Sequence, residues 1–385
     1  MSNVIPHLTD YFKCSVGVKQ GDSSPTLFNI YINDLVSILS NQFSPIIDNE
    51  KVNCLQFADD LIIFSHSKFE LQQNLDKLSQ YCLAWKLKIN IDKTKIIKLS
   101  STGKVCNEVF TINDKIIECV NEYKYLGIII TSNCQFTTAQ KKLLEKSNKA
   151  CFKLKGILNN CNVNPKIQLK LYDNLVSPIL LYGSEIWGVT KFKKIDGKIN
   201  DSTFFYDLFD KTIAEKSHVN FCRFILGTHK ASCKSAVRGE LGRYPLQLKI
   251  WMSVFKFVNH ILKQNENSFV RKALNEQRNM ANDNSWFGQL KHFCNSVHIN
   301  FDFNSINNDK VIYSIKQHLQ SLYTQHWKCH ININNKLSPV YAKIKADINY
   351  ESYLDQVQSL KLRKHVSESV HIIYELKEID ITTIK

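Results

Sequence analysis

The chain has 385 residues, 44% of them hydrophobic and 22% charged, which excludes large-scale disorder and allows two or three domains. Lys and Arg number 50 against 35 Asp and Glu, a formal net charge of +15, and a surface this basic favours nucleic acid as a partner. The chain shows no signal-peptide pattern at its first residues and no apolar run long enough for a membrane span. The 12 cysteines are scattered among apolar neighbours, as free thiols are. We therefore predict an intracellular protein, not secreted and without a membrane partner.

The first third of the chain predicts alternating helices and strands. The spacing of apolar residues and turn signals predicts a helix over 27–38 after a turn at 20–25, a hairpin over 52–65 and a helix over 69–87. It then predicts a strand, a turn and a second strand over 88–99, followed by single strands at 110–117 and 123–130. The hairpin has two adjacent acids, Asp59 and Asp60, at its tip.

From Thr131 onward the pattern becomes helical. Residues 139–158 form an amphipathic helix with lysines between its apolar positions, and Asn164-Pro165 is typical of the start of another helix. A polar, basic segment at 191–200 reads as a linker, and the remainder is predicted to be mostly helical, with Asn-rich joints near 279–285 and 304–309.

The acidic pair at the hairpin tip is the strongest candidate for chemistry. Two adjacent carboxylates repel one another unless a cation binds them, and Mg²⁺ takes one or two carboxylates together with water and phosphate oxygens. A pair of such ions stabilises both oxygens of an in-line phosphoryl displacement. Taken alone, however, the four residues Phe57-Ala58-Asp59-Asp60 are better explained as a simple Asp-rich hairpin turn.

Four motifs occur in a fixed order around this pair: Gln20-Gly21 with Ser24-Pro25 before it, Phe57-Ala58-Asp59-Asp60 itself, Leu87-Lys88-Ile89-Asn90 with Lys93, and Tyr125-Leu126-Gly127. In this order the chain resembles the palm of a reverse transcriptase from a non-LTR, LINE-like retrotransposon. The resemblance covers about 14–130 and continues through Trp187-Gly188 and the segment 239–245. It implies an RNA-directed DNA polymerase that uses Mg²⁺ or Mn²⁺, an RNA template, a DNA primer and deoxynucleotides.

The resemblance also implies residue roles. Asp59 and Asp60 would bind the metal, and Lys93 would act at the triphosphate. Gln20, Gly21 and Phe28 would position the template and the incoming nucleotide, and Tyr125, Leu126 and Gly127 would grip the primer end. Each position also has a plainer interpretation, as a turn, a core strand or a solvated side chain. The basic helix would contact nucleic acid through lysines that track phosphates: Lys141, Lys142, Lys146, Lys149 and Lys153.

The expected fold is α+β, with a partial palm over 1–130, a helical thumb over 131–190 and a mostly helical C-terminal region over 191–385. The chain departs from the family's pattern in two places. Only nineteen residues precede Gln20, where the family has fingers and an earlier palm strand with another metal-binding aspartate. Two residues, rather than three, separate Gln20-Gly21 from Ser24-Pro25. We therefore expect the chain as printed to be inactive alone, with an uncovered sheet edge and apolar surface in its palm part.

Two other functions stay open at this point: a catalytically dead nucleic-acid-binding remnant, and a host-recruited interaction protein. Zinc is not expected. His218 and Cys222, His229 and Cys233, and the group at 326–330 do not reproduce the spacing of a zinc site. His and Cys on an amphipathic helix such as 216–226 are more often packed than ligated.

Overall fold

The protein combines helices with small sheets, and this confirms the predicted α+β class. The computed structural model describes residues 24–104, 106–189, 206–210, 212–280, 285–307, 309–333, 341, 345–356 and 363. Contacts divide the chain into two units. The first comprises Met1–Lys98 and Val105–Val120, and the second comprises Leu99–Lys104 and Asn121–Lys385. Among the described residues, no helix is long and apolar enough to cross a membrane.

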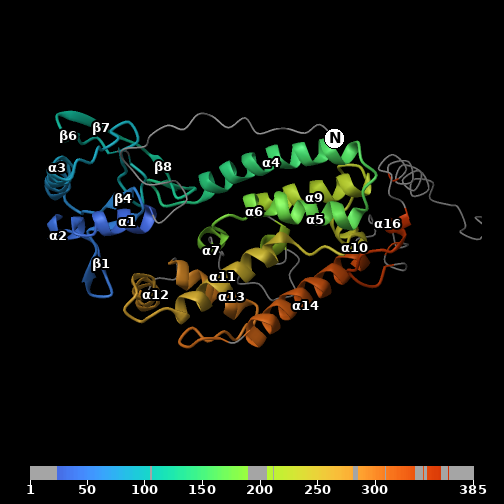
Figure 1. Ribbon diagram of the computed structural model, residues 1–385. Helices are drawn as coiled ribbons and strands as arrows, with labels where there is room; N and C mark the ends of the chain where they lie inside the picture. Colours follow the sequence, from blue (N-terminus) through green and yellow to red (C-terminus); the bar gives the residue numbers. More distant parts are fainter. Residues whose placement is uncertain are drawn as a thin grey trace, which may run out of the picture. The chain divides into compact units, whose positions relative to one another are not determined.

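The first unit contains most of the strands (Figure 1). Its elements are α1 (Ser24–Tyr31), α2 (Leu35–Ile38), β1 (Ile46–Ile47), β2 (Glu50–Lys51), β3 (Cys54–Phe57), β4 (Asp60–Ile63), α3 (Lys68–Ala84), β5 (Lys95–Ile96), β6 (Phe110–Ile112) and β7 (Lys115–Cys119). β7 lies between β5, to which it is parallel, and β6, to which it is antiparallel. Leu75 of α3 packs in one small core with Ile96, Phe110 and Ile117.

Buried polar contacts connect α3 to the loop after α2. The Ser67 side chain caps α3, and the Glu70 carboxylate accepts hydrogen bonds from the Ser40 and Ser65 hydroxyls and the Phe43 amide. Burial alone would raise the pKa of Glu70, but these hydrogen bonds lower it below its usual value. The carboxylate therefore stays charged and orders the chain that leads into the acidic hairpin.

Three predicted elements of this unit need correction. The helix over 27–38 is two helices, α1 and α2. The first strand expected within 88–99 is wrong: residues 88–90 form no strand, and Asn90 starts a turn in which its carbonyl accepts from the Thr94 amide. The strand expected at 110–117 is a hairpin, because Asn113 and Asp114 take positive φ values of 48° and 60°, which suit the tight turn between two strands.

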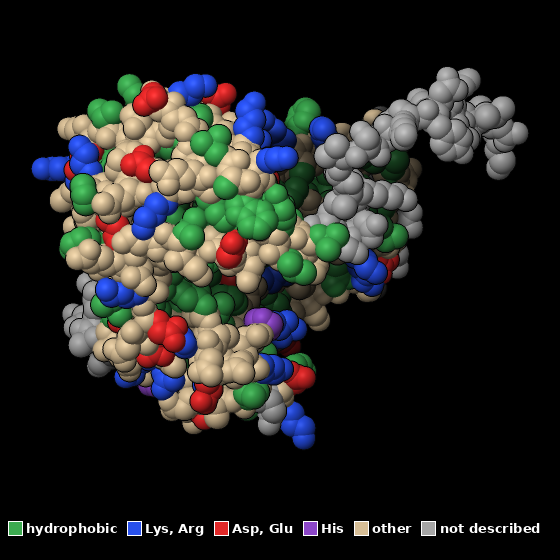
Figure 2. All heavy atoms as spheres, turned by 60° about the vertical axis from the view of Figure 1, so that its left-hand side comes forward, with side chains coloured by type: hydrophobic (Ala, Val, Ile, Leu, Met, Phe, Trp, Pro, Cys, Tyr) green, Lys and Arg blue, Asp and Glu red, His purple; other side chains and the backbone are tan. Residues whose placement is uncertain are grey.

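The first unit exposes apolar side chains. Ile30 is 69% exposed, Phe57 61% and Phe69 70%. Figure 2 turns the side that carries this unit forward and shows hydrophobic side chains gathered in patches among charged ones. Exposed apolar surface was predicted for this part of the chain.

The second unit is mainly helical. Its elements are β8 (Glu122–Tyr125), β9 (Ile128–Thr131), α4 (Thr137–Asn159), α5 (Pro165–Leu175), α6 (Ser177–Leu180), α7 (Ser184–Trp187), the π-helix η1 (Tyr206–Asp210), α9 (Ile213–Leu226), α10 (Lys234–Glu240), α11 (Leu246–Lys263), α12 (Phe269–Asn279), α13 (Trp286–Ser296), α14 (Asp309–Ile333) and α16 (Tyr353–Gln356). The largest core includes Trp251 of α11, which stacks on Phe293 of α13 with ring centroids 3.6 Å apart, and Trp327 of α14.

Several helical predictions are confirmed here. α4 covers the predicted lysine-rich helix, and the Asn164 side chain caps α5 by accepting from the Lys166 amide at 2.8 Å. The predicted linker at 191–200 lies outside the described residues. The contact division falls after Val120, before the boundary predicted at residue 130, so the hairpin β8–β9 belongs to the second unit.

Candidate functional site

The acidic pair lies at the tip of the hairpin β3–β4, as predicted. Cys54 pairs with Ile63, and Phe57 pairs with Asp60, so only Ala58 and Asp59 form the turn. Ala58 has a φ of 51°, which this tight turn requires. Asp60 is therefore the first residue of β4 and not a turn residue. Both aspartates are exposed, so their carboxylates are accessible to a ligand.

The donor chemistry of this tip fits a divalent cation. Asp59 and Asp60 offer carboxylate oxygens, and Mg²⁺ accepts one or two carboxylates when water and substrate phosphates complete its shell. Over the part of the chain that the structure describes, no group of three His, Cys, Asp or Glu side chains gathers in a way that could hold a metal. If a cation bound at this tip, the two carboxylates would supply part of its shell, and water and phosphate oxygens would supply the rest.

The other predicted residues of the first unit are placed as follows. Lys93 is exposed in a turn, where its amide donates to the Asn90 carbonyl at 3.2 Å. Phe28 is half-buried on α1. Gln20 and Gly21 lie outside the described residues, as does the shortened spacing that follows them.

The predicted primer grip is a second tight hairpin, in the second unit. Tyr125 pairs with Ile128, and the turn consists of Leu126 and Gly127, with φ values of 44° and 86°. Leu126 is 40% exposed. Residues 123–130, predicted as one strand, are therefore two strands and a turn.

The predicted basic helix carries an exposed stripe of lysines. Lys142, Lys146, Lys149 and Lys153 recur at intervals of four and three, which places them on one face of α4. These four and Lys141 are all exposed, and Glu145 is the only acid in the helix. The opposite face is buried through Leu143, Leu154 and other apolar residues. α4 therefore presents a predominantly positive strip, with the exposed Glu145 beside it, as expected for contact with phosphates.

Comparison with known proteins identifies the segment that contains the acidic hairpin. Residues 5–130 match the family described as Reverse transcriptase (RNA-dependent DNA polymerase). This segment is therefore similar to reverse transcriptases. Over 183 residues the chain is 27% identical to the RNA-directed DNA polymerase from mobile element jockey of Drosophila funebris, a region covering 45% of this chain and 19% of that protein.

A second relative gives the same result. Over 125 residues the chain is 34% identical to the Retrovirus-related Pol polyprotein from type-2 retrotransposable element R2DM of Drosophila melanogaster, covering 30% of this chain and 12% of that protein. The predicted likeness to non-LTR retrotransposon polymerases is confirmed. The chain spans about a fifth or less of the length of these relatives.

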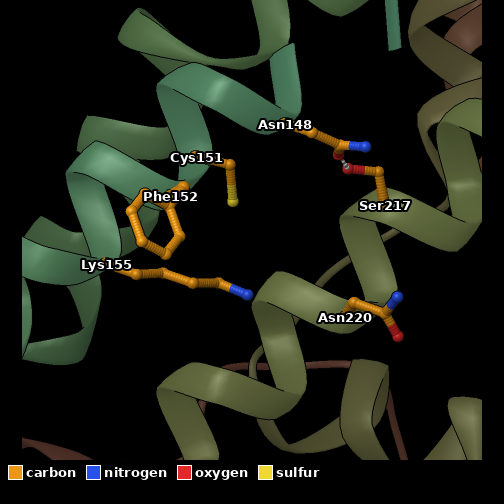
Figure 3. A pocket seen from close by; sticks show the side chains of 6 residues that line it. All are labelled: Asn148, Cys151, Phe152, Lys155, Ser217 and Asn220. Atoms are coloured by element: carbon orange, nitrogen blue, oxygen red, sulfur yellow. Dashed lines mark hydrogen bonds between the residues drawn. The ribbon is translucent and has the colours of Figure 1, made fainter. Parts of the chain in front are cut away.

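Beyond the reverse transcriptase segment, a groove of about 240 Å³ lies between α4 and α9 (Figure 3). The Asn148 amide oxygen accepts from the Ser217 hydroxyl at one end of it. The Lys155 side chain extends from α4 toward α9, and its ammonium lies 5.2 Å from the centroid of the Phe224 ring. Cys151 lines the groove, and burial raises the pKa of its thiol, so it stays neutral. This cysteine is a packing residue rather than a nucleophile.

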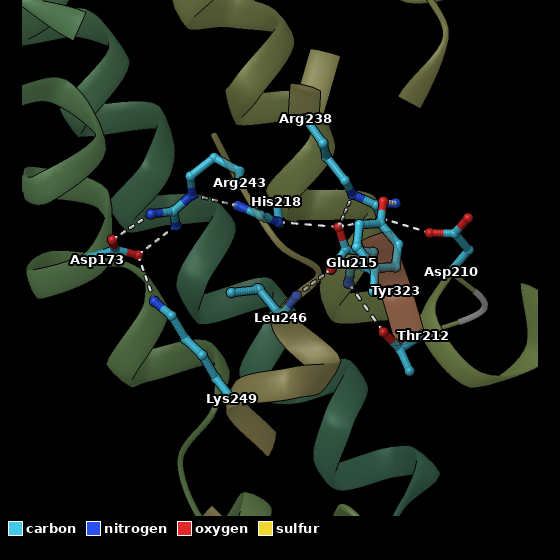
Figure 4. A network of polar contacts seen from close by, with 10 residues as sticks. All are labelled: Asp173, Asp210, Thr212, Glu215, His218, Arg238, Arg243, Leu246, Lys249 and Tyr323. Carbon is cyan, nitrogen blue, oxygen red and sulfur yellow. Dashed lines mark hydrogen bonds and ion pairs between the residues drawn. The ribbon is translucent and has the colours of Figure 1, made fainter. Parts of the chain in front are cut away.

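A buried polar network, which the sequence did not predict, ties the second unit together (Figure 4). Arg238 donates to the Glu215 carboxylate at 2.6 Å, to Asp210 at 2.6 Å and to the Tyr323 hydroxyl at 2.7 Å. The other Glu215 oxygen accepts from the Leu246 amide at 2.6 Å. Because a buried charge is stable only when paired, this one arginine couples α9, α10, α14 and η1.

The network continues through His218 to Asp173. Arginine nitrogens only donate, so the 3.3 Å contact from Arg243 makes Nε2 of His218 the acceptor and places its proton on Nδ1, which faces Glu215 at 3.1 Å. Arg243 also forms two 2.7 Å hydrogen bonds with the Asp173 carboxylate. Both ring nitrogens of His218 are thus occupied, and the candidate pair His218–Cys222 is packed rather than ligated.

We expect these carboxylates to make the second unit sensitive to acid. Burial would raise the pKa of both Glu215 and Asp173. Arg238 and His218 nevertheless lower the pKa of Glu215 to about 2. Arg243 and Lys249 likewise lower the pKa of Asp173 to about 2. Since the folded-state values lie below the ordinary ones of about 4, the stabilisation is complete above pH 4.5 and is lost as the pH falls toward 2.

Thermal melts followed by circular dichroism test this expectation. The melting temperature should change little between pH 7 and pH 5 and fall below about pH 4.5. Asp173→Asn should lower the melting temperature at neutral pH, and its melting temperature should then fall less than that of the unaltered chain as the pH drops below about 4.5. An equally large fall in both chains would contradict this assignment for Asp173.

Proposed function

We propose that this chain is the part of a retrotransposon's RNA-directed DNA polymerase that contains the acidic palm hairpin, a helical thumb and a helical C-terminal region. The observation that carries the proposal is the position of Asp59 and Asp60, exposed at a hairpin tip inside the segment that matches reverse transcriptases. The substrates would be deoxynucleotides, an RNA template and a DNA primer. The basic composition of the chain supports a polyanionic substrate.

In this function the protein mainly positions charged groups. Asp59 and Asp60 would bind Mg²⁺ or Mn²⁺, which supplies positive charge at the phosphoryl oxygens. The exposed Lys93 would add a further positive charge near the triphosphate, and Phe28 and the Gln20-Gly21 pair would orient the template and nucleotide. The Leu126-Gly127 turn would contact the primer end.

Primer extension on an RNA template, with Mg²⁺ and then Mn²⁺, tests the proposal. Metal-dependent extension by the chain would support it. Duplex binding without extension would favour the second candidate, a nucleic-acid-binding part without chemistry. That candidate draws support from the exposed lysines of α4, which suit phosphate contact without any chemistry. An absence of duplex binding at low salt would contradict both.

The lysine stripe should dominate the salt dependence of binding. Each phosphate contact on a duplex contributes about 0.9 to the slope of log affinity against log salt concentration. Lys146→Gln with Lys149→Gln should therefore reduce that slope by about 1 to 2, measured by fluorescence anisotropy with a primer–template duplex. The matched control is Lys310→Gln with Lys316→Gln, two exposed lysines on α14. Equal slopes for the two double variants would argue against a thumb role for α4.

A further inference from the structure

The turn of the β8–β9 hairpin is bound by a residue far away in the sequence. Tyr182 lies between α6 and α7, and its hydroxyl donates a hydrogen bond to the Leu126 carbonyl at 2.9 Å. Leu126 is the first turn residue and has a left-handed φ of 44°. The hydrogen bond therefore fixes the carbonyl of a residue whose backbone conformation is intrinsically unfavourable.

Two glycines allow the hairpin turn and the Tyr182 segment to approach closely. A Cβ on Gly127 would lie 2.9 Å from Cε1 of Tyr182, and a Cβ on Gly183 would lie 2.6 Å from Cδ1 of Ile128. Both glycines also have positive φ values. A larger residue at Gly127 would collide with the Tyr182 ring, and one at Gly183 would require the Ile128 side chain to move. The positive φ values would strain either substitution as well.

The Tyr182 segment is itself anchored in the helical core. The indole nitrogen of Trp187 donates to the Tyr182 carbonyl at 2.8 Å, and the Trp187 ring is buried against Leu143 of α4 and Ile250 of α11. The hairpin turn is therefore connected through Tyr182 to the long helices of the second unit.

Both the turn and the tyrosine that holds it stay accessible. Leu126 is 40% exposed and Tyr182 is 50% exposed. We propose that Tyr182 is a positioning residue for the primer: it holds the Leu126-Gly127 turn in the conformation that meets the primer's 3′ end. The inference has two parts. The first, that Tyr182 holds the turn, needs no ligand; the second, that the turn meets the primer end, rests on the proposed function.

Hydrogen exchange with Tyr182→Phe tests the first part. The variant keeps the ring and loses only the hydroxyl, so we expect amide exchange across 122–131 to accelerate by about 2- to 10-fold, the usual value of one net hydrogen bond. Tyr313→Phe, at a tyrosine on α14 that is 58% exposed, should leave the hairpin unchanged. Unchanged exchange in Tyr182→Phe would overturn the inference.

Binding measurements test the second part. The dissociation constant of a primer–template duplex should rise in Tyr182→Phe by a factor similar to the change in exchange, whereas that of an RNA duplex without a primer end should stay the same. A melting temperature within a degree or two of the unaltered chain would show that the fold persists. Faster exchange with unchanged primer–template binding would overturn the positioning role. If the unaltered chain bound no duplex, the proposed function and the primer-positioning role of Tyr182 would both be wrong. The hydrogen-exchange result would still show whether Tyr182 holds the hairpin turn.

Discussion

Arg238→Met is expected to lower the free energy of unfolding of the second unit by about 3 to 5 kcal/mol, the usual cost of breaking a buried ion pair from one side. Arg238 is almost fully buried, and it donates to Glu215, Asp210 and Tyr323. Methionine fills much of the same volume but leaves the Glu215 carboxylate inside the protein without its main countercharge. Urea unfolding followed by circular dichroism measures the change.

Lys249→Met is the matched control. It removes a cation of the same network, but the Lys249 side chain is 45% exposed, and its partner Asp173 keeps both hydrogen bonds from Arg243. Exposed ion pairs contribute about 1 kcal/mol or less, so the control should be nearly as stable as the unaltered chain. Similar losses in the two variants would show that burial does not determine the contribution of Arg238.

Asp59→Asn is expected to have the largest effect on activity. It removes one of the two charges at the hairpin tip without changing the size of the side chain, and a metal's contribution of several kcal/mol corresponds to a loss of about a hundredfold or more in rate. The affinity for Mn²⁺, measured by titration calorimetry, should fall, and primer extension should fall with it wherever the unaltered chain extends a primer.

The control for this variant is Asp114→Asn. Asp114 is also exposed in a tight hairpin turn of the first unit, between β6 and β7, but it lies outside the acidic motif. It should leave both extension and Mn²⁺ affinity unchanged. If Asp59→Asn binds Mn²⁺ as tightly as Asp114→Asn does, the acidic pair is not a metal site in this chain.

Local sequence signals predicted the features that depend on local structure. Apolar runs on both sides of Asp59-Asp60 predicted their hairpin, helical periodicity predicted α4, and Asn164 before Pro165 predicted the start of α5. Local signals also misled where a tight turn interrupts an apolar run, as at Asn113-Asp114.

The buried network could not be predicted in this way, because its members are distant in sequence. Arg238 is 23 residues from Glu215 and 85 from Tyr323. One signal was present: Glu215 and His218 occupy positions i and i+3 on the apolar face of α9, where charged groups are buried only when partners exist elsewhere. The partners themselves are set by tertiary packing. The Tyr182 contact, 56 residues from Leu126, escaped prediction for the same reason.

The membership of β8–β9 in the second unit has a practical consequence for dividing the chain into separately expressed pieces. A piece that starts at Thr131 would keep only the last residue of β9 and would leave Tyr182 and Gly183 without the turn against which they pack. A piece that starts at Asn121 would contain the complete ladder from Glu122 to Thr131 and the helices of the second unit, and it would lack only Leu99–Lys104 of that unit. The natural cutting point for recombinant fragments is therefore before the hairpin and not after it.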